Sequence, residues 1–248
     1  MMFQEYSFVD RFAAAAKAGF TAVEYVGPYA FPAAEIVARL KDNGLRQVLF
    51  NLPAGDWDKG ERGIACLPKR QKEFREGVKR AIEFAHALEC PRINCLAGLA
   101  PAGIAKSELW STLTENLAFA AENLAAAHIE LLVEPINHFD MPGFLLNTSA
   151  DGVKAIAACG HPNIKLQYDI YHMQRMEGEL AATISTLLPL IGHIQIADNP
   201  GRHEPGSGEI NYEFLFQHLR NVNYENWIGC EYRPRGKTED SLGWMKSQ

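Results

Sequence analysis

This sequence of 248 residues lacks the features that mark several large classes of protein. No apolar run reaches the roughly 18 residues that a membrane-spanning helix needs. The first residues, MMFQEYSFVDRF, include acidic side chains and no apolar stretch of the kind found in signal peptides. Basic residues are in the minority, and the net charge of −6 argues against nucleic acid as the main partner. We therefore expect a cytoplasmic protein that binds neither membranes nor nucleic acids.

Several common active-site motifs are also missing. The phosphate-binding patterns GxGxxG and GxxxxGK(S/T) do not occur, so we expect no nucleotide cofactor. The GxSxG pattern of serine hydrolases is absent as well. The chain has five cysteines and no CxxC pair, which favours reduced thiols over disulfides.

Short apolar runs alternate with helical patterns along the whole chain. Runs of this length, bounded by polar residues or glycine, are typical of buried parallel strands. A length of 248 residues suits one (β/α)8 TIM barrel better than two small domains, so we expect a single domain over residues 1–248. The pattern predicts strands at 20–26, 46–51, 92–98, 131–135, 166–172, 193–198 and 227–232, and helices near 8–18, after Pro32, after Pro68, and near 106–127, 148–158, 177–190, 211–221 and Thr238.

The first predicted helix has no strand before it. Ser7 and Asp10 have the spacing of a helix cap, so residues 1–6 are too short and too close to the helix to form a strand. We therefore expect an α/β barrel that lacks its first strand in this chain. The strands at 20–26 and 227–232 would then have exposed edges, which can pair with another copy of the chain. Low stability or formation of a homo-oligomer is the expected consequence.

Four polar residues occupy the same relative place in successive strands. Glu134, Asp169, Gln195 and Glu231 each lie at or near the carboxyl end of an apolar run. The carboxyl ends of barrel strands meet at one face, so these side chains are expected to converge there. Three carboxylates and one amide oxygen suit a hard divalent cation such as Mg²⁺ or Mn²⁺. The alternative is that each residue separately caps its own loop.

Two of these residues can also transfer protons. Glu134 and Glu231 would face each other across the barrel mouth, one on each side of a small substrate. A proton taken from one carbon and returned to the next is an aldose–ketose isomerisation through an enediol. His172, Arg202 and Asn51 lie at or after strand ends and are candidate substrate-binding residues. Arg202 could instead form an ion pair with Glu204 that anchors its loop.

A long connection follows Asn51. The segment LPAGDWDKGERGIACLP is rich in glycine and charge and has Trp57 in its middle. Loops longer than about 12–15 residues are commonly functional lids or disordered segments. We expect a lid over the carboxyl face of the barrel.

The strings that carry these residues resemble the hydroxypyruvate isomerase family of the xylose-isomerase-like TIM-barrel superfamily. The resemblance covers nearly the whole chain and is carried by NLPAGDWDKGERGIACLP, LLVEPINHFDMPGF, QYDIYHMQRMEGEL, HIQIADNPGRHEPGSGEINY and WIGCEYRPRG. It implies interconversion of hydroxypyruvate, a small anionic hydroxy-oxo acid, with 2-hydroxy-3-oxopropanoate. The family's proton-transferring glutamates fall on Glu134 and Glu231.

The wider superfamily implies further roles. Its divalent metal ligands fall on Glu134, Asp169, Gln195 and Glu231, although its sugar epimerases have histidine where this chain has Gln195. The epimerases' substrate-contacting residues fall on His172 and Arg202. The alternatives on the same scaffold are a 2-oxo-tetronate isomerase and a ketose 3-epimerase. An AP-endonuclease-like phosphodiesterase and a non-catalytic sugar-acid binding protein fit the sequence less well.

Overall fold

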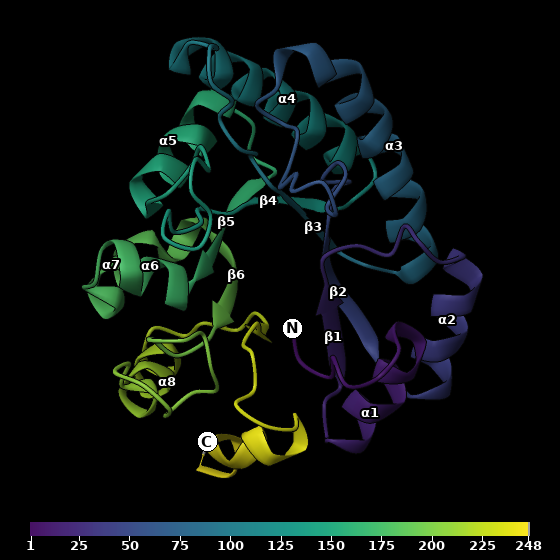
Figure 1. Cartoon of the computed structure of the whole chain (residues 1–248), viewed down its shortest axis with the longest axis vertical. Helices are drawn as coiled ribbons and strands as arrows, with labels where there is room; N and C mark the ends of the chain where they lie inside the picture. The colour runs from purple at the N-terminus through teal and green to yellow at the C-terminus, as the bar shows by residue number, and fades with distance from the viewer. Residues whose placement is uncertain (248) are drawn as a thin grey trace.

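Seven parallel strands form one sheet in the order in which they occur in the chain. The computed structural model describes residues 1–247, and within them each strand pairs with the next one in sequence. The sheet curls into a ring that the helices surround, and the amino terminus lies inside the ring in the view of Figure 1. The predicted TIM barrel is therefore confirmed. The strands are β1 (Ala22–Tyr25), β2 (Arg46–Asn51), β3 (Arg92–Cys95), β4 (Glu130–Val133), β5 (Ile164–Asp169), β6 (Ile191–Ile196) and β7 (Ile228–Cys230).

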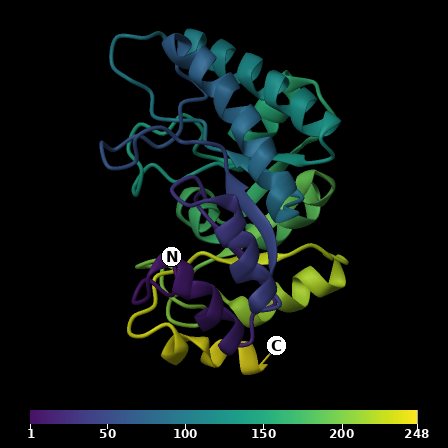
Figure 2. The same cartoon turned by 90° about the vertical axis from the view of Figure 1, so that its right-hand side faces the viewer.

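Helices follow the strands and cover the outside of the ring, as the turned view of Figure 2 also shows. The α-helices are α1 (Arg11–Lys17), α2 (Ala33–Asp42), α3 (Gln71–Leu88), α4 (Lys106–Ala126), α5 (Ser149–Cys159), α6 (Ile170–Met176), α7 (Leu180–Leu187) and α8 (Tyr212–Asn221). Short 3-10 helices are η1 (Phe8–Asp10), η2 (Pro68–Arg70), η3 (Leu188–Leu190) and η4 (Glu239–Ser247). No helix of the described chain is long and apolar enough to cross a membrane.

The core lies between the helices and the outer face of the sheet. Helix α3 shows the principle, because its buried residues Phe74, Val78, Ala81 and Ala85 recur at three- or four-residue spacing. Strands β5 and β6 are buried over almost their whole length, as expected for parallel strands covered on both faces. This packing fixes the strand ends, and so the side chains that follow them.

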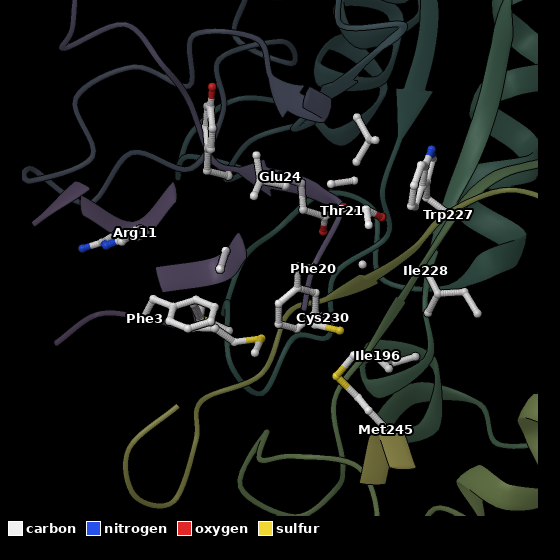
Figure 3. A pocket seen from close by; sticks show the side chains of 18 of the residues that line it. Phe3, Arg11, Phe20, Thr21, Glu24, Ile196, Trp227, Ile228, Cys230 and Met245 are labelled. Atoms are coloured by element: carbon white, nitrogen blue, oxygen red, sulfur yellow. The ribbon is translucent and has the colours of Figure 1, made fainter. Parts of the chain in front are cut away.

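The ring is open between β1 and β7. Among the described residues these two strands are the edges of the sheet, and residues 1–6 form turns rather than a strand. The Phe3 backbone N–H donates to Thr238 Oγ1 at 2.7 Å. A largely apolar cavity of about 720 Å³ separates the two edges (Figure 3). The expectation that residues 1–6 do not supply a barrel strand is confirmed.

Three details of the predicted elements were wrong. The run 166–172 is not one strand: β5 ends at Asp169, whose side chain caps α6 by accepting from the backbone N–H groups of Tyr171 and His172. Helix α6 therefore occupies the end of the run predicted as a strand, and the helix expected near 177–190 consists of α7 followed by the 3-10 helix η3. Ser7 does not cap the first helix, because its hydroxyl donates to the Asp10 carboxylate instead. The last short helix expected near Thr238 is confirmed as the 3-10 helix η4, which begins at Glu239.

Candidate active site

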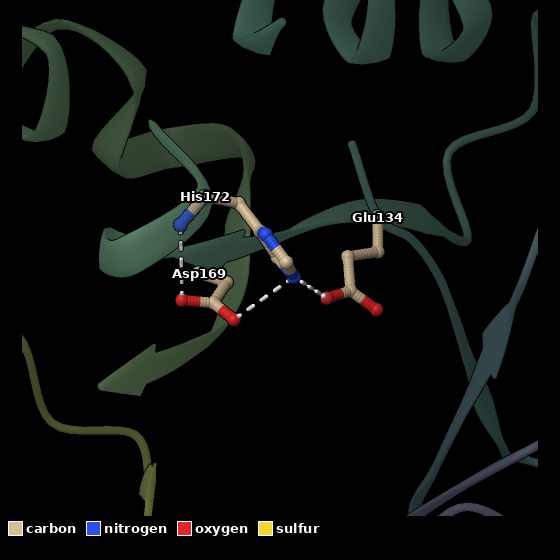
Figure 4. Close-up of side chains that lie close together, drawn as sticks. All are labelled: Glu134, Asp169 and His172. Carbon is tan, nitrogen blue, oxygen red and sulfur yellow. Dashed lines mark hydrogen bonds and ion pairs between the residues drawn. The ribbon is translucent and has the colours of Figure 1, made fainter. Parts of the chain in front are cut away.

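A cluster of buried polar side chains lies at the carboxyl ends of β4 and β5. Glu134 directly follows β4, Asp169 ends β5, and His172 lies in the first turn of α6. His172 Nε2 is 3.4 Å from Asp169 Oδ2 and 3.9 Å from Glu134 Oε1 (Figure 4). One ligand atom from each of the three lies within 4.8 Å of the other two.

Asp169 serves two purposes through its two oxygens. Its Oδ1 atom accepts from Tyr171 N at 2.8 Å and from His172 N at 3.4 Å, at the positive end of α6. Its Oδ2 atom is left to face His172 and Arg202. This capping arrangement brings the Asp169 carboxylate and the His172 ring next to each other.

Arg202 links Asp169 to the other end of the site. One nitrogen, Nη2, contacts Asp169 Oδ2 at 3.2 Å and Glu231 Oε2 at 2.9 Å. Burial opposes the charge, but the nearby carboxylates raise the pKa of Arg202 above its ordinary value, so it stays a cation. The side chain pairs with these two residues and not with Glu204, which accepts from the Arg235 backbone N–H. Asp169 and Glu231 are therefore both within reach of one positive group.

Glu134 is positioned by an asparagine that the sequence did not single out. Asn94 Nδ2, at the carboxyl end of β3, donates to Glu134 Oε2 at 3.0 Å and to Asn51 Oδ1 at 3.2 Å. Asn94 Oδ1 is buried and has no partner among the described residues. Burial, together with repulsion from Glu231 and Asp169, raises the pKa of Glu134 well above its ordinary value. A raised pKa favours the protonated form of this carboxyl group, which is the form that a general acid needs.

His172 is held as a neutral imidazole. Burial, and then repulsion from Arg202, lower the pKa of His172 to about 3. Its Nε2 atom faces the carboxylates, whereas its Nδ1 atom lies 2.6 Å from Asn137 Nδ2. His172 therefore offers the site one nitrogen of a neutral ring.

Gln195 is oriented by hydrogen bonds to Gln167 and Glu24. It is the register partner of Asp169 on the neighbouring strand. Gln195 Nε2 donates to Glu24 Oε1 at 2.8 Å, and Gln195 Oε1 accepts from Gln167 Nε2 at 2.7 Å. Glu24 also pairs with His193 Nε2 at 2.6 Å. Glu24 is not among the site residues predicted from the sequence, although it too is a carboxylate within an apolar run.

The segment after Asn51 is anchored at its end and exposed at its tip. Residues 64–66 are buried, and Cys66 N donates to Ala97 O. At the tip, Trp57 is 40% exposed and stacks against the Arg62 guanidinium, 4.0 Å from the ring centroid. Its role as a lid stays a prediction.

The donor set fits a divalent cation. Glu134 and Asp169 supply carboxylate oxygens, and their mutual repulsion is the kind that a bound cation would relieve. Glu231 is joined to Asp169 through Arg202, while Gln195 lies beside Asp169 with its amide engaged by Gln167 and Glu24. Metal binding by these four residues stays a prediction.

Comparisons with known proteins identify the family. The model of the xylose isomerase-like TIM barrel family matches residues 12–248, and the chain belongs to this family. The chain is 53% identical over 245 residues to hydroxypyruvate isomerase of Escherichia coli strain K12, which covers 99% of this chain and 95% of that protein. It is 50% identical over 246 residues to 2-oxo-tetronate isomerase of Cupriavidus necator, with coverage of 99% and 95%. With relatives of this kind, the chain is an enzyme of the isomerase class.

A solved structure shares the whole fold. The crystal structure titled AP endonuclease, family 2, from Brucella melitensis superimposes with a TM-score of 0.96 at 43% sequence identity. The match covers 99% of this chain and 95% of that one. The backbone fold that carries the site therefore also occurs in an experimentally determined structure of a relative.

Proposed function

We propose that this enzyme interconverts hydroxypyruvate and 2-hydroxy-3-oxopropanoate by proton transfer between neighbouring carbons. The observation that carries this proposal is the buried Glu134, whose raised pKa suits acid–base work and which lies beside His172. The 53% identity to a hydroxypyruvate isomerase supports the choice of substrate. This substrate is a small anion, in keeping with a site that contains the half-buried cation Arg202.

The reaction needs a base, an acid and donors to oxygen. One glutamate takes a proton from C3 of hydroxypyruvate, and the electron pair of that C–H bond forms the C2–C3 double bond of an enediol. The C2 carbonyl oxygen gains a proton in this step, and the proton that the C3 hydroxyl loses in the next step balances it. The enediol then loses the proton of its C3 hydroxyl, C2 gains a proton from the second glutamate, and an aldehyde forms at C3. Glu134 and Glu231 are the two groups we assign to these transfers.

His172 and Arg202 would stabilise the oxygens on which negative charge develops. His172 Nε2 faces Glu134 and Asp169, and Arg202 Nη2 contacts Asp169 and Glu231. Fixed donors of this kind act more strongly at a buried site than in water. A Mg²⁺ or Mn²⁺ ion held by Glu134, Asp169, Gln195 and Glu231 would supply further electrostatic stabilisation of the enediolate oxygens.

The second candidate keeps the chemistry and changes the substrate. The 50% identity to a 2-oxo-tetronate isomerase favours a four-carbon acid almost as strongly as the three-carbon one. A phosphodiesterase on nucleic acid is less favoured, because the net charge of −6 would repel a polyanion. Turnover rates with hydroxypyruvate, 2-oxo-tetronate and a six-carbon ketose, measured side by side, separate these substrates.

The test of the mechanism is proton exchange in deuterated water. The unaltered enzyme should convert hydroxypyruvate and place deuterium on C2 of the product, which proton NMR detects. Glu134→Gln and Glu231→Gln should each abolish most of the conversion, whereas Glu122→Gln, an exposed glutamate on α4, should not. Failure of the unaltered enzyme to act on either the three- or the four-carbon acid would disprove the proposal.

A further inference from the structure

Asn137 lies behind His172 and is completely buried. It comes three residues after Glu134, in the segment that leaves β4. Its Oδ1 atom accepts from the backbone N–H of Asp140 at 2.9 Å. Its Nδ2 atom lies 3.2 Å from Asp140 Oδ2 and 2.6 Å from His172 Nδ1. All three contacts are made by one side-chain amide, so the orientation of this amide decides whether His172 Nδ1 faces a donor or an acceptor.

Asp140 fixes that orientation. Its carboxylate accepts from Tyr171 O–H at 2.8 Å and pairs with Arg175. Partial burial acts in the other direction, but the hydrogen bonds from Tyr171, Asn137 and Arg175 keep the pKa of Asp140 below its ordinary value. An ionised carboxylate only accepts hydrogen bonds, so the amide nitrogen of Asn137 must face it. A flipped amide would also turn its N–H₂ toward the backbone N–H of Asp140.

The consequence for His172 is a fixed tautomer. The Asn137 amide nitrogen points at Nδ1 as a donor, and the Asn137 backbone N–H lies 3.5 Å from the same atom. A neutral imidazole that accepts at Nδ1 carries its hydrogen on Nε2. That hydrogen is directed at the Asp169 and Glu134 carboxylates.

We propose that Asn137 is a positioning residue that keeps His172 as an Nε2–H donor and so excludes it from the metal's ligand set. A histidine that binds metal through Nε2 has its hydrogen on Nδ1 and needs an acceptor there. Asn137 offers donors at that position. His172 is thereby available to donate a hydrogen bond to a substrate oxygen. That role rests on the proposed function, whereas the tautomer of His172 does not.

The tautomer can be measured directly on the complete protein. The chain is labelled with ¹⁵N-histidine, and His172 is assigned by comparison with His172→Gln. We expect the nitrogen shifts and proton couplings of a neutral ring with hydrogen on Nε2. A ring with hydrogen on Nδ1 would overturn the proposal, whether or not the enzyme turns over hydroxypyruvate.

Asn137→Asp tests the positioning role by replacing the donor at Nδ1 with an acceptor. The His172 hydrogen should move to Nδ1, and the freed Nε2 lone pair should join Glu134 and Asp169 as a ligand. Residues that hydrogen-bond to a metal ligand typically change metal affinity about 10- to 100-fold, so Zn²⁺ should bind at least about 10-fold more tightly in calorimetry. The gain should disappear in the double variant Asn137→Asp, His172→Gln. Unchanged Zn²⁺ affinity in the folded single variant would refute the role.

The kinetics of the variant and the behaviour of the unaltered protein distinguish failure of this proposal from failure of the proposed function. Loss of the Nε2–H donor should lower kcat about 10²- to 10³-fold, the usual effect of removing one fixed donor. If Asn137→Asp does not fold, the tautomer measured in the unaltered protein decides. If the unaltered enzyme is inactive on the proposed substrates, the proposed function fails, and the tautomer and Zn²⁺ measurements still test Asn137.

Discussion

Replacing Glu134 by glutamine should make the enzyme nearly inactive and, at neutral pH, more stable. Glutamine keeps the shape and an oxygen that can accept from Asn94 Nδ2, so the local packing is preserved. It removes the titrating group, which costs about 10²- to 10⁴-fold in turnover for a general acid or base. That loss corresponds to about 2.7–5.4 kcal/mol of activation free energy.

The gain in stability follows from the raised pKa. The ordinary value is 4.5, and folding raises the pKa of Glu134 well above it through burial and the charges of Glu231 and Asp169. Between these two values the folded state binds more protons than the unfolded state, so the stability of the unaltered protein falls as pH rises. The contribution is fully present below the unfolded-state pKa and is lost as pH rises through the folded pKa. Each unit of elevation corresponds to about 1.4 kcal/mol.

Urea denaturation between pH 4 and pH 8, with EDTA present so that no cation masks the effect, measures this difference. The two proteins should have similar free energies of unfolding near pH 4, and the glutamine variant should become the more stable one as pH rises. Glu122→Gln should follow the unaltered protein throughout. The reasoning is refuted if the difference between variant and parent does not change with pH, or if the variant keeps more than about a tenth of the turnover.

Four further predictions concern the rest of the site. Glu231→Gln should lower turnover about 10²- to 10⁴-fold in the same assay while circular dichroism stays unchanged. Asp198 accepts from the backbone N–H groups of Asn199, Gly206, Gly208 and Ile210, so Asp198→Ala should release the loop that carries Arg202. It should destabilise the fold by about 2–4 kcal/mol in urea denaturation, because several charge-assisted hydrogen bonds are lost. Replacing residues 57–60 by a short Gly-Ser turn should lower kcat in steady-state kinetics without changing the melting temperature, and unchanged kinetics would exclude a lid. EDTA should reduce turnover and Mn²⁺ should restore it; full activity after dialysis against EDTA would exclude a required metal.

The sequence predicted the parts of the site that carry an electrostatic cost. Glu134, Asp169 and Glu231 stand out because an ionised side chain is expensive to bury without a partner, and each interrupts an apolar run. Asn94 and Asn137 are neutral amides and carry no comparable electrostatic cost. A neutral amide near a strand end is common, and the importance of these two lies in partners 40 and 35 residues away, at Glu134 and His172. Only the fold brings those residues together.

Glu24 was not predicted as a site residue for a different reason. It has the same signal as Glu134, a carboxylate within an apolar run, but it lies in the middle of β1 rather than at its end. Its partners, His193 and Gln195, lie on β6, across the opening of the ring. Gly229 leaves the space for its carboxylate, since a Cβ there would lie 2.1 Å from Glu24 Oε1. A rule limited to strand ends could not find this residue.

Charge explains why the two nitrogen-bearing side chains of the site differ so sharply. Glu134, Asp169 and Glu231 give the site three carboxyl groups, whose ionised forms carry negative charge that would repel an anionic substrate. Arg202 offsets part of it and stays a cation, because two of those carboxylates contact it. His172 lies beside that guanidinium, and burial and repulsion keep the ring neutral. A neutral ring can still donate one hydrogen bond, provided that its hydrogen is on the nitrogen that faces the substrate. Asn137 supplies that condition, so a permanent cation and a neutral donor both face Asp169 Oδ2, at 3.2 Å from Arg202 Nη2 and 3.4 Å from His172 Nε2.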